Sequence, residues 1–251
     1  MSFSALVLAG SRGEADPLAA YTGVTDKALI EIAGRTMLAR VVEALREAGA
    51  TRIFVSATSE AVRQHALALG TTALVSAAGP SASAREGLAR AGAPLLLTTA
   101  DHALLRPEWV RGFLNDVPAC DVAALLASRP TVERDAPDTR RTWLRFADGE
   151  WSGCNLFWLA TPAADAALEL WQHVERDRKK PWRIVRRLGP GLLLRYLLGS
   201  LTLAEAVAAL GRRAGVDARI VAAGYGLAAV DVDKPADLDL VRALIEGGEA
   251  S

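Results

Sequence analysis

Short apolar segments alternate with segments of helical periodicity along most of this chain, and this alternation constrains the fold more than any other feature. Between the apolar segments, stretches such as 36–50 place apolar residues at helical spacing and end near a glycine. A β-α-β-α order predicts a Rossmann-like three-layer α/β/α fold, with a mostly parallel sheet covered by helices on both faces. The segments predicted as strands are 5–9, 52–56, 73–75, 94–98, 122–126 and 218–222.

Length and composition set further limits. A chain of 251 residues with 51% hydrophobic residues fits a single domain over 1–251 with a substantial core. The 29 basic and 29 acidic residues cancel, and because general nucleic-acid binders carry a basic excess, no nucleic-acid partner is expected. Cys120 and Cys154 match no metal-site spacing and are predicted as buried structural thiols. No signal-peptide pattern and no apolar stretch of membrane-spanning length is found, so a cytoplasmic location is expected, with the oligomeric state open.

The first predicted strand runs into a glycine-rich turn, Gly10, Ser11, Arg12 and Gly13. Such a turn exposes backbone N–H groups that bind phosphate oxygens, and here Ser11 adds a hydroxyl donor and Arg12 a positive charge. Lys27 supplies a mobile ammonium group before the next apolar run. The alternative is an ordinary surface turn, since the sequence matches neither the P-loop nor the Rossmann glycine pattern.

Carboxylates follow two of the predicted strands. Asp101 ends a strand at the edge of the sheet where ligands bind, and oxygen ligands there suit Mg²⁺; alternatively, Asp101 caps the next helix. Asp231 and Asp233 fall on the same side of an extended strand, where two carboxylates repel unless a cation or donors lie between them. Asp237 and Asp239 are assigned to the first turn of the final helix, where the helix dipole favours acids.

Three more positions are candidate substrate contacts. The stretch SAAGPSASAREGL places Gly79 and Ser83 where a flat ring can approach the backbone, although Ser81 or Ser83 can instead cap the following helix. Asn155 follows a predicted hairpin around 148–149 and is either a substrate contact or a turn residue.

Histidines and nucleophiles form no recognisable catalytic set. His65, His102 and His173 are scattered, and no Ser-His-Asp or Cys-His arrangement follows from the sequence. His102 neighbours Asp101 and is a further metal-ligand candidate. Attack by an ionised phosphate needs positioning and charge neutralisation rather than a general base, so this pattern favours phosphate chemistry.

The segment 130–217 departs from the regular alternation. After its irregular first part, a helix is predicted over 162–178, followed by two or three helices that form a lid. A basic cluster near the middle of the segment is interpreted as a solvated helix face. The alternatives are that it binds an anionic acceptor or that it makes a peripheral contact with acidic lipid headgroups. The cluster comprises Arg176, Arg178, Lys179, Lys180, Arg183, Arg186 and Arg187.

Three segments, in this order and spacing, resemble the MobA-like NTP transferases, which are nucleotidyltransferases of the GT-A-like fold. They are the N-terminal stretch LVLAGSRG with DKALIEIAGRTMLARVVEALREAGATRIFV, the strand end LLLTTADHALLRPEWV, and the closing stretch VDVDKPADLDLV. The resemblance covers roughly 1–127 and 218–246. It implies that 130–217 is the acceptor-binding or lid region of the same domain.

The resemblance implies a reaction as well as a fold. A Mg²⁺-dependent enzyme of this kind transfers a nucleoside monophosphate from a nucleoside triphosphate, here CTP or GTP, to a phosphorylated sugar, polyol or cofactor and releases pyrophosphate. Leu8, Ala9 and Gly10 are then expected to border the base and ribose. Gly79 and Ser83 are expected to meet the base, and the acceptor is expected near Asn155.

The resemblance also assigns the charged groups. It implies that the β- and γ-phosphates are held by Ser11, Arg12 and Gly13, and that Lys27 neutralises charge at the α-phosphate. Asp101 and Asp231 are the implied Mg²⁺ ligands, with Asp233 as an alternative or second ligand. The implied catalytic residues are Arg12, Lys27 and Asp101.

Two positions depart from the family pattern, and two other functions stay open. Ala15 stands where the family often has an arginine, and Asp26 stands where it often has a proline. One alternative is a glycosyltransferase of the same fold, which is expected to carry a mid-domain D-x-D motif; here Asp231 and Asp233 form such a pair late in the chain. The other is a catalytically silent nucleotide-binding regulatory protein, which pyrophosphate release would exclude.

Overall fold

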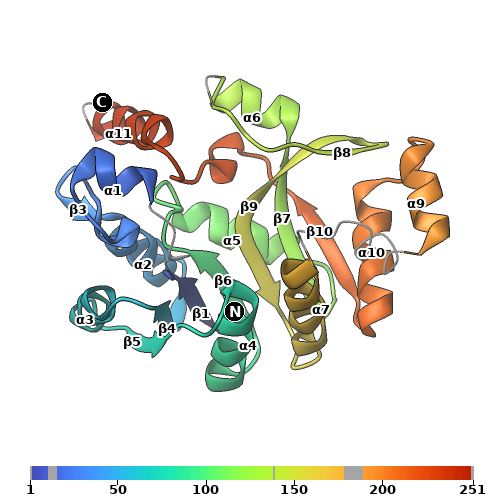
Figure 1. The fold of residues 1–251 in the computed structure, drawn as a ribbon, viewed down its shortest axis with the longest axis horizontal. Helices are drawn as coiled ribbons and strands as arrows, with labels where there is room; N and C mark the ends of the chain where they lie inside the picture. The colour runs from blue at the N-terminus through green and yellow to red at the C-terminus, as the bar shows by residue number, and fades with distance from the viewer. Residues whose placement is uncertain (1, 11–15, 138, 178–188, 250–251) are drawn as a thin grey trace.

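The computed structural model describes residues 2–10, 16–137, 139–177 and 189–249 and confirms the three-layer α/β architecture (Figure 1). The main sheet has the order β10-β7-β9-β6-β1-β4-β5, with β8 paired to β9. β9 runs antiparallel to its neighbours, whereas the other neighbouring pairs are parallel. Its strands are β1 (Phe3–Leu8), β4 (Ala50–Ala57), β5 (Thr72–Val75), β6 (Leu95–Thr99), β7 (Val122–Ser128), β8 (Leu144–Phe146), β9 (Gly149–Leu159) and β10 (Ala218–Ala222).

Helices cover both faces of this sheet, and a two-stranded ribbon of β2 (Glu31–Ile32) and β3 (Arg35–Thr36) lies beside it. The α-helices of the described residues are α1 (Pro17–Thr22), α2 (Met37–Glu47), α3 (Glu60–Ala68), α4 (Pro80–Ala91), α5 (Pro107–Asp116), α6 (Arg129–Asp135), α7 (Ala164–Asp177), α9 (Pro190–Leu197), α10 (Leu203–Ala214) and α11 (Pro235–Glu249). Two short 3₁₀ helices, η1 (Lys27–Leu29) and η2 (Gly226–Ala229), carry or precede residues of the candidate site.

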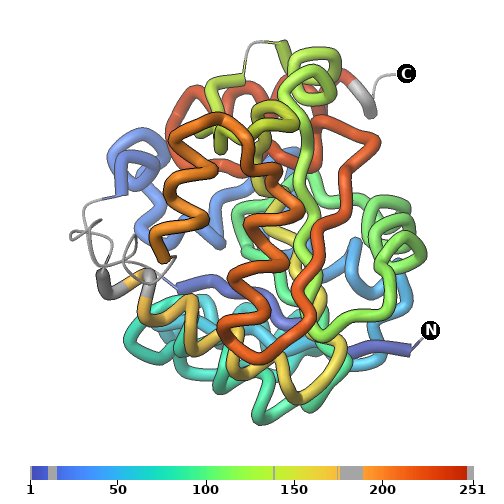
Figure 2. The backbone as a smooth tube through the Cα atoms, turned by 90° about the vertical axis from the view of Figure 1, so that its right-hand side faces the viewer, coloured from blue at the N-terminus to red at the C-terminus, as the bar shows by residue number. Residues whose placement is uncertain are grey.

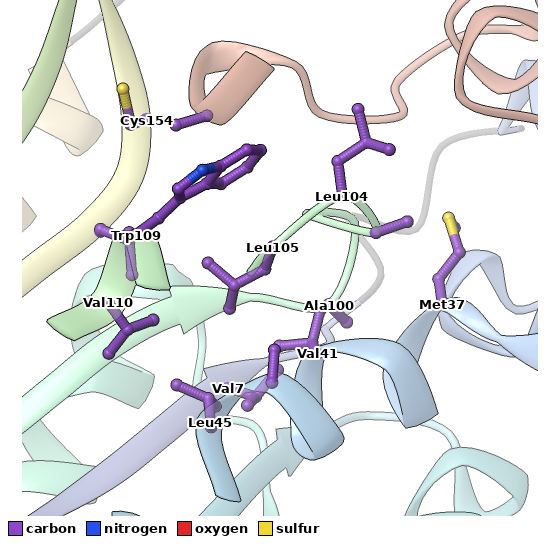
Figure 3. Packing of buried hydrophobic residues seen from close by; sticks show 14 of the residues in the cluster. Val7, Met37, Val41, Leu45, Ala100, Leu104, Leu105, Trp109, Val110 and Cys154 are labelled. Atoms are coloured by element: carbon purple, nitrogen blue, oxygen red, sulfur yellow. The ribbon is translucent and has the colours of Figure 1, made fainter. Parts of the chain in front are cut away.

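The core is split by the sheet, because successive strand residues point to opposite faces. Val7 of β1 packs in the larger cluster with residues of α2 and α5, and Figure 3 shows it close to Val41 and Leu45. Leu6, the preceding residue, packs on the other face with residues of α4 and α7, including Leu88. Burial on both faces explains why the parallel strands are continuous apolar runs in the sequence.

Helix ends follow recognisable signals in some places and not in others. The Thr36 hydroxyl caps α2 by accepting from the Ala39 N–H at 3.1 Å. The prediction that Ser81 or Ser83 caps α4 is wrong: Gly79 is the N-cap residue and makes no side-chain cap bond. Ser83 Oγ instead accepts from the Ala77 N–H at 3.0 Å, which fixes the loop before the helix.

The segment 130–217 contributes strands to the main sheet. The predicted hairpin is confirmed as β8–β9, and β9 lies inside the main sheet between β6 and β7. The later helices α9 and α10 lie at the β10 edge (Figure 2). α9 and the residue after it expose Leu194, Leu197 and Leu198 by 57%, 70% and 70%. Every helix in the described part of the chain is too short or too polar to cross a bilayer.

Two expectations need correction, and a third concerns residues outside the described ranges. Asp231 and Asp233 do not lie on a strand: the chain leaves β10, forms η2 and passes through an irregular connector to Pro235, the first residue of α11. Both cysteines are free and Cys154 is buried, but Cys120 is only partly buried. The basic residues from Arg178 to Arg187 lie outside the described residues.

Candidate active site

The carboxyl ends of the central parallel strands form one rim. β1, β4 and β6 end in register, with Leu8 opposite Ser56 and Thr99. The chain continues this pairing past the strands, because Ala9 N–H donates to Ser56 O at 2.8 Å and Ala100 N–H donates to Leu8 O at 3.0 Å. The turn after β1 and the turn that carries Asp101 are therefore neighbours, as ligand sites of open α/β sheets require.

The turn after β1 closely approaches the loop after β5. A side chain at Gly10 would place its Cβ 3.2 Å from Ser76 Oγ, a tighter contact than is usual, so glycine suits this position. Leu8 and Ala9 are partly buried at the rim. The other predicted residues of this turn, Ser11, Arg12 and Gly13, and the departure at Ala15 lie outside the described residues.

Lys27 lies between two of the predicted carboxylates. Its Nζ is 2.7 Å from Asp101 Oδ2 and 2.9 Å from Asp233 Oδ1. Burial opposes the charged ammonium, but the attraction of the two carboxylates outweighs that cost and raises the pKa of Lys27 above its usual range. The lysine therefore stays protonated, as charge neutralisation of a phosphate requires.

Asp26, which precedes Lys27, has a hydrogen-bond partner in another part of the chain. Asp26 Oδ2 accepts a hydrogen bond from Ser59 Oγ at 2.7 Å. Ser59 begins the α3 region beyond β4. Asp26 thus helps to fix the short helix η1 that presents Lys27.

Asp101 belongs to the site and not to a helix cap. The N-cap residue of α5 is Arg106, so the helix-cap interpretation of Asp101 is wrong. The Asp101 backbone carbonyl accepts from Val232 N–H at 3.1 Å, which ties the connector before α11 to this turn. Its Oδ1 atom is buried and has no hydrogen-bond partner among the described residues.

Asp231 is held by one cation and one amide. Arg141 Nη2 lies 2.5 Å from its Oδ1, and Asn155 Nδ2 donates to its Oδ2 at 2.8 Å. Burial raises the pKa of the Asp231 carboxyl; Arg141 opposes this shift, and the nearby charges of Asp101 and Asp233 add to it. The three predicted carboxylates are thus close enough to influence one another.

Asn155 reaches Asp231 because β9 is irregular at this point. Leu126 of β7 pairs with Gly153, but Ala124 pairs with Phe157, so the register of the two strands shifts in between. Asn155 lies within this bulge and has a φ of 50°, a left-handed conformation that asparagine tolerates better than most residues. Bulges commonly re-aim a side chain beside a site, as this one does.

Arg141 is the residue that sequence reasoning missed. It comes from the irregular stretch between α6 and β8, where Arg140 and Arg145 are also basic, so no local pattern distinguishes it. Its side chain is only 11% exposed, and its Nε atom is buried with no partner among the described residues. A nearly buried guanidinium is costly unless paired, and its pairing with Asp231 is the structural signal.

The loop before α4 lies along the same rim. Ser76 Oγ is 3.1 Å from Ser56 Oγ, and the Ser76 N–H donates to Ala57 O at 3.2 Å. The loop thus leads from the end of β5, past Gly10, to Gly79 and Ser83 at the start of α4, whereas Asp101 follows β6.

Comparisons with known proteins identify the family of the chain. A family model described as the MobA-like NTP transferase domain matches residues 5–190. The chain belongs to this family. It is therefore a nucleotidyltransferase, and the predicted resemblance is confirmed. A search of curated proteins found no match.

Solved structures show the same fold. A hypothetical transferase from Thermus thermophilus is similar at 32% identity and a TM-score of 0.81, covering 95% of this chain and 100% of its own. A CMP:2-keto-3-deoxy-manno-octonic acid synthetase complexed with CTP is similar at 18% identity and a TM-score of 0.62, covering 99% and 100%. A 2-C-methyl-D-erythritol 4-phosphate cytidylyltransferase, also from Thermus thermophilus, is similar at 17% identity and a TM-score of 0.57, covering 98% and 100%.

The donor set can be tested for its fit to Mg²⁺. Within the described ranges, no three acidic, cysteine or histidine side chains are arranged to hold a metal ion, and Lys27 occupies the space between Asp101 and Asp233. Two features nevertheless fit a hard cation: the partnerless Oδ1 of Asp101 and the mutual repulsion of the Asp101 and Asp231 carboxylates.

His102 does not belong to this donor set. Its ring is buried and stacks on Trp109, with ring centroids 6.3 Å apart. Burial lowers the pKa of His102 to about 4. The histidine is therefore a neutral core residue behind Asp101.

Proposed function

We propose that this nucleotidyltransferase uses Mg²⁺ to transfer a nucleoside monophosphate, from CTP or GTP, to a phosphorylated sugar, polyol or cofactor. An oxygen of the acceptor phosphate attacks the α-phosphorus, the bond to the bridging oxygen breaks, and pyrophosphate leaves. The observation that carries the proposal is the gathering of Lys27, Asp101, Asp231 and Asp233 at the rim beside the turn after β1.

The donor half of the reaction is assigned to the β1 side of the rim. Gly10 and the residues after it would bind the phosphates, and Lys27 would move from its carboxylate partners to the α-phosphate as charge develops there. Asp101 and Asp231 would hold Mg²⁺, with Asp233 as the second or alternative ligand. When bound, the ion would neutralise the phosphate oxygens and orient them for in-line displacement.

The acceptor half is assigned to the residues around Asp231. Asn155 and Arg141 approach this carboxylate from β9 and from the stretch before β8. A metal ion on Asp231 would compete with Arg141 for that charge. Arg141 would then be available to an acceptor phosphate, for which its planar, permanently charged guanidinium is suited.

Pyrophosphate release from each triphosphate with Mg²⁺ and a panel of sugar and polyol phosphates tests this function. For the active pair, Asp101→Asn is expected to lower the rate by at least about a hundredfold, because a metal ion contributes several kcal/mol to transition-state charge stabilisation. Asp116→Asn, a change of an exposed acid at the end of α5, serves as the matched control. Full activity of the Asp101 variant would refute the metal assignment, and nucleotide binding without pyrophosphate release would favour a regulatory protein.

A further inference from the structure

Helix α7 brings a carboxylate to the start of α4. It packs antiparallel to α4, and Figure 1 shows the two helices side by side. Near the start of α7, Asp165 pairs with Arg85 at 2.7 Å. Near its end, Glu175 reaches Ser81 in the first turn of α4. Glu175 therefore lies where the loop 76–79 enters the helix.

The two oxygens of Glu175 have different surroundings. Oε2 accepts from Ser81 Oγ at 2.6 Å and from the Ser81 N–H at 3.4 Å. Oε1 faces Gly79, where a Cβ would lie only 3.0 Å from it. Ser81 thus fixes Oε2, and Oε1 lies beside Gly79.

This position lies where a bound nucleotide would extend. Its phosphates would lie at the turn after β1 and near Lys27, and Gly10 is in close approach to Ser76. The loop 76–79 leads from this contact to Gly79 at the start of α4, so a base that lies along these small residues would reach Gly79. The edge of a ring against Gly79 would then meet Glu175 Oε1.

The geometry points to Glu175 as the residue that selects the nucleobase. An ionised carboxylate only accepts hydrogen bonds, so Oε1 matches an exocyclic amino group, as in cytosine or guanine, and repels the O4 carbonyl of uracil. The inference rests on the proposed function and deepens it. Glu175 makes the enzyme specific for a triphosphate whose base bears an amino group.

Glu175→Gln is the sharpest test, because the contact with Ser81 fixes the orientation of the new side-chain amide. The Ser81 N–H can only donate, so the amide oxygen takes the place of Oε2 and the amide NH₂ group faces the base. Isothermal titration with Mg²⁺ compares CTP with UTP and GTP with inosine triphosphate, which lacks the 2-amino group. A hydrogen bond to a charged group implies at least about a tenfold preference for the amino-bearing member of the favoured pair.

The expected result is that Glu175→Gln reduces this preference at least about tenfold and improves binding of the member of the pair that lacks the amino group. Glu169→Gln changes an exposed acid on the same helix and is expected to keep the wild-type ranking. An unchanged ranking in Glu175→Gln would overturn the inference and leave the proposed function intact. Equal affinities within both pairs for the wild-type protein would overturn it without any variant. Failure of every triphosphate to bind would instead overturn the nucleotide site itself, and the inference with it.

Discussion

The two parts of the chain that build the site are held in place in different ways. In the parallel part, residues 3–128, the end of β6 places Asp101, and the short helix η1 places Lys27. In the inserted part, residues 129–233, a strand bulge, an irregular stretch and a connector place Asn155, Arg141 and Asp231. Asp101 is positioned by backbone hydrogen bonding beside β1, whereas Arg141 and Asn155 both contact the side chain of Asp231.

This difference separates a rigid support from an adjustable one. Strand ends in register leave little freedom, because moving one would break the ladder that fixes its neighbours. The contacts of Arg141 and Asn155 with Asp231 are side-chain contacts that no such ladder fixes. Under the proposed function, the parallel part would serve the donor nucleotide, and Arg141 and Asn155 of the inserted part would serve the acceptor.

The largest expected effect compares one glycine from each part. Gly226→Ala would drive its Cβ into the Thr131 backbone oxygen, and backbone cannot yield cheaply. We expect a loss of more than about 3 kcal/mol in the free energy of unfolding. Gly87→Ala would instead meet Leu6 Cδ2, the end of a side chain. Its cost should be about 1–2 kcal/mol, partly offset by helix propensity. Urea unfolding measures both; equal losses would refute the distinction.

The next effect concerns the charge balance of the inserted part. Arg141→Ala leaves the poorly exposed Asp231 without its cation and should cost about 3 kcal/mol of stability. Added Mg²⁺ should restore part of this loss if Asp231 is a metal ligand. Thermal unfolding with and without Mg²⁺ measures the effect, with Arg140→Ala as the exposed control. A loss that Mg²⁺ does not reduce would contradict the metal role of Asp231 but not the ion pair.

The smallest effect isolates the bulge of β9. Asn155→Gly and Asn155→Ala both remove the hydrogen bond to Asp231, but only alanine opposes a φ of 50°. The alanine variant should therefore be less stable than the glycine variant by about 1 kcal/mol. Chemical unfolding of the two proteins gives the difference directly. Equal stabilities would mean that the bulge relaxes when the asparagine is lost.

The sequence predicts the parallel part well, because local patterns carry its structure. The apolar segment 5–9 corresponds closely to β1, and the segment 36–50 contains α2 with its Thr36 cap. The rule that ligands bind beyond the carboxyl ends of parallel strands places Asp101 at the rim, and the structure joins it there to Lys27 by a 2.7 Å ion pair.

The inserted part is harder to predict, since its structure depends on distant contacts. No local sequence pattern indicates that β9 lies between β6 and β7, or that Arg141 rather than Arg140 is buried. The alternation of Asp231 and Asp233 with valine fits the period of a strand, but Pro235 starts α11 and the chain bends into it. The choice between substrate contact and turn residue for Asn155 also depends on a bulge that only the folded sheet defines.

The ion pairs of Lys27 have a consequence for biosynthesis. Its partners lie 74 and 206 positions further along the chain. A growing polypeptide can bring Lys27 to Asp101 once β6 has left the ribosome, while Asp231 and Asp233 are still to be made. The charged cluster is thus completed only after every strand of the sheet has been translated, and a nascent chain would hold a half-assembled, inactive centre until then.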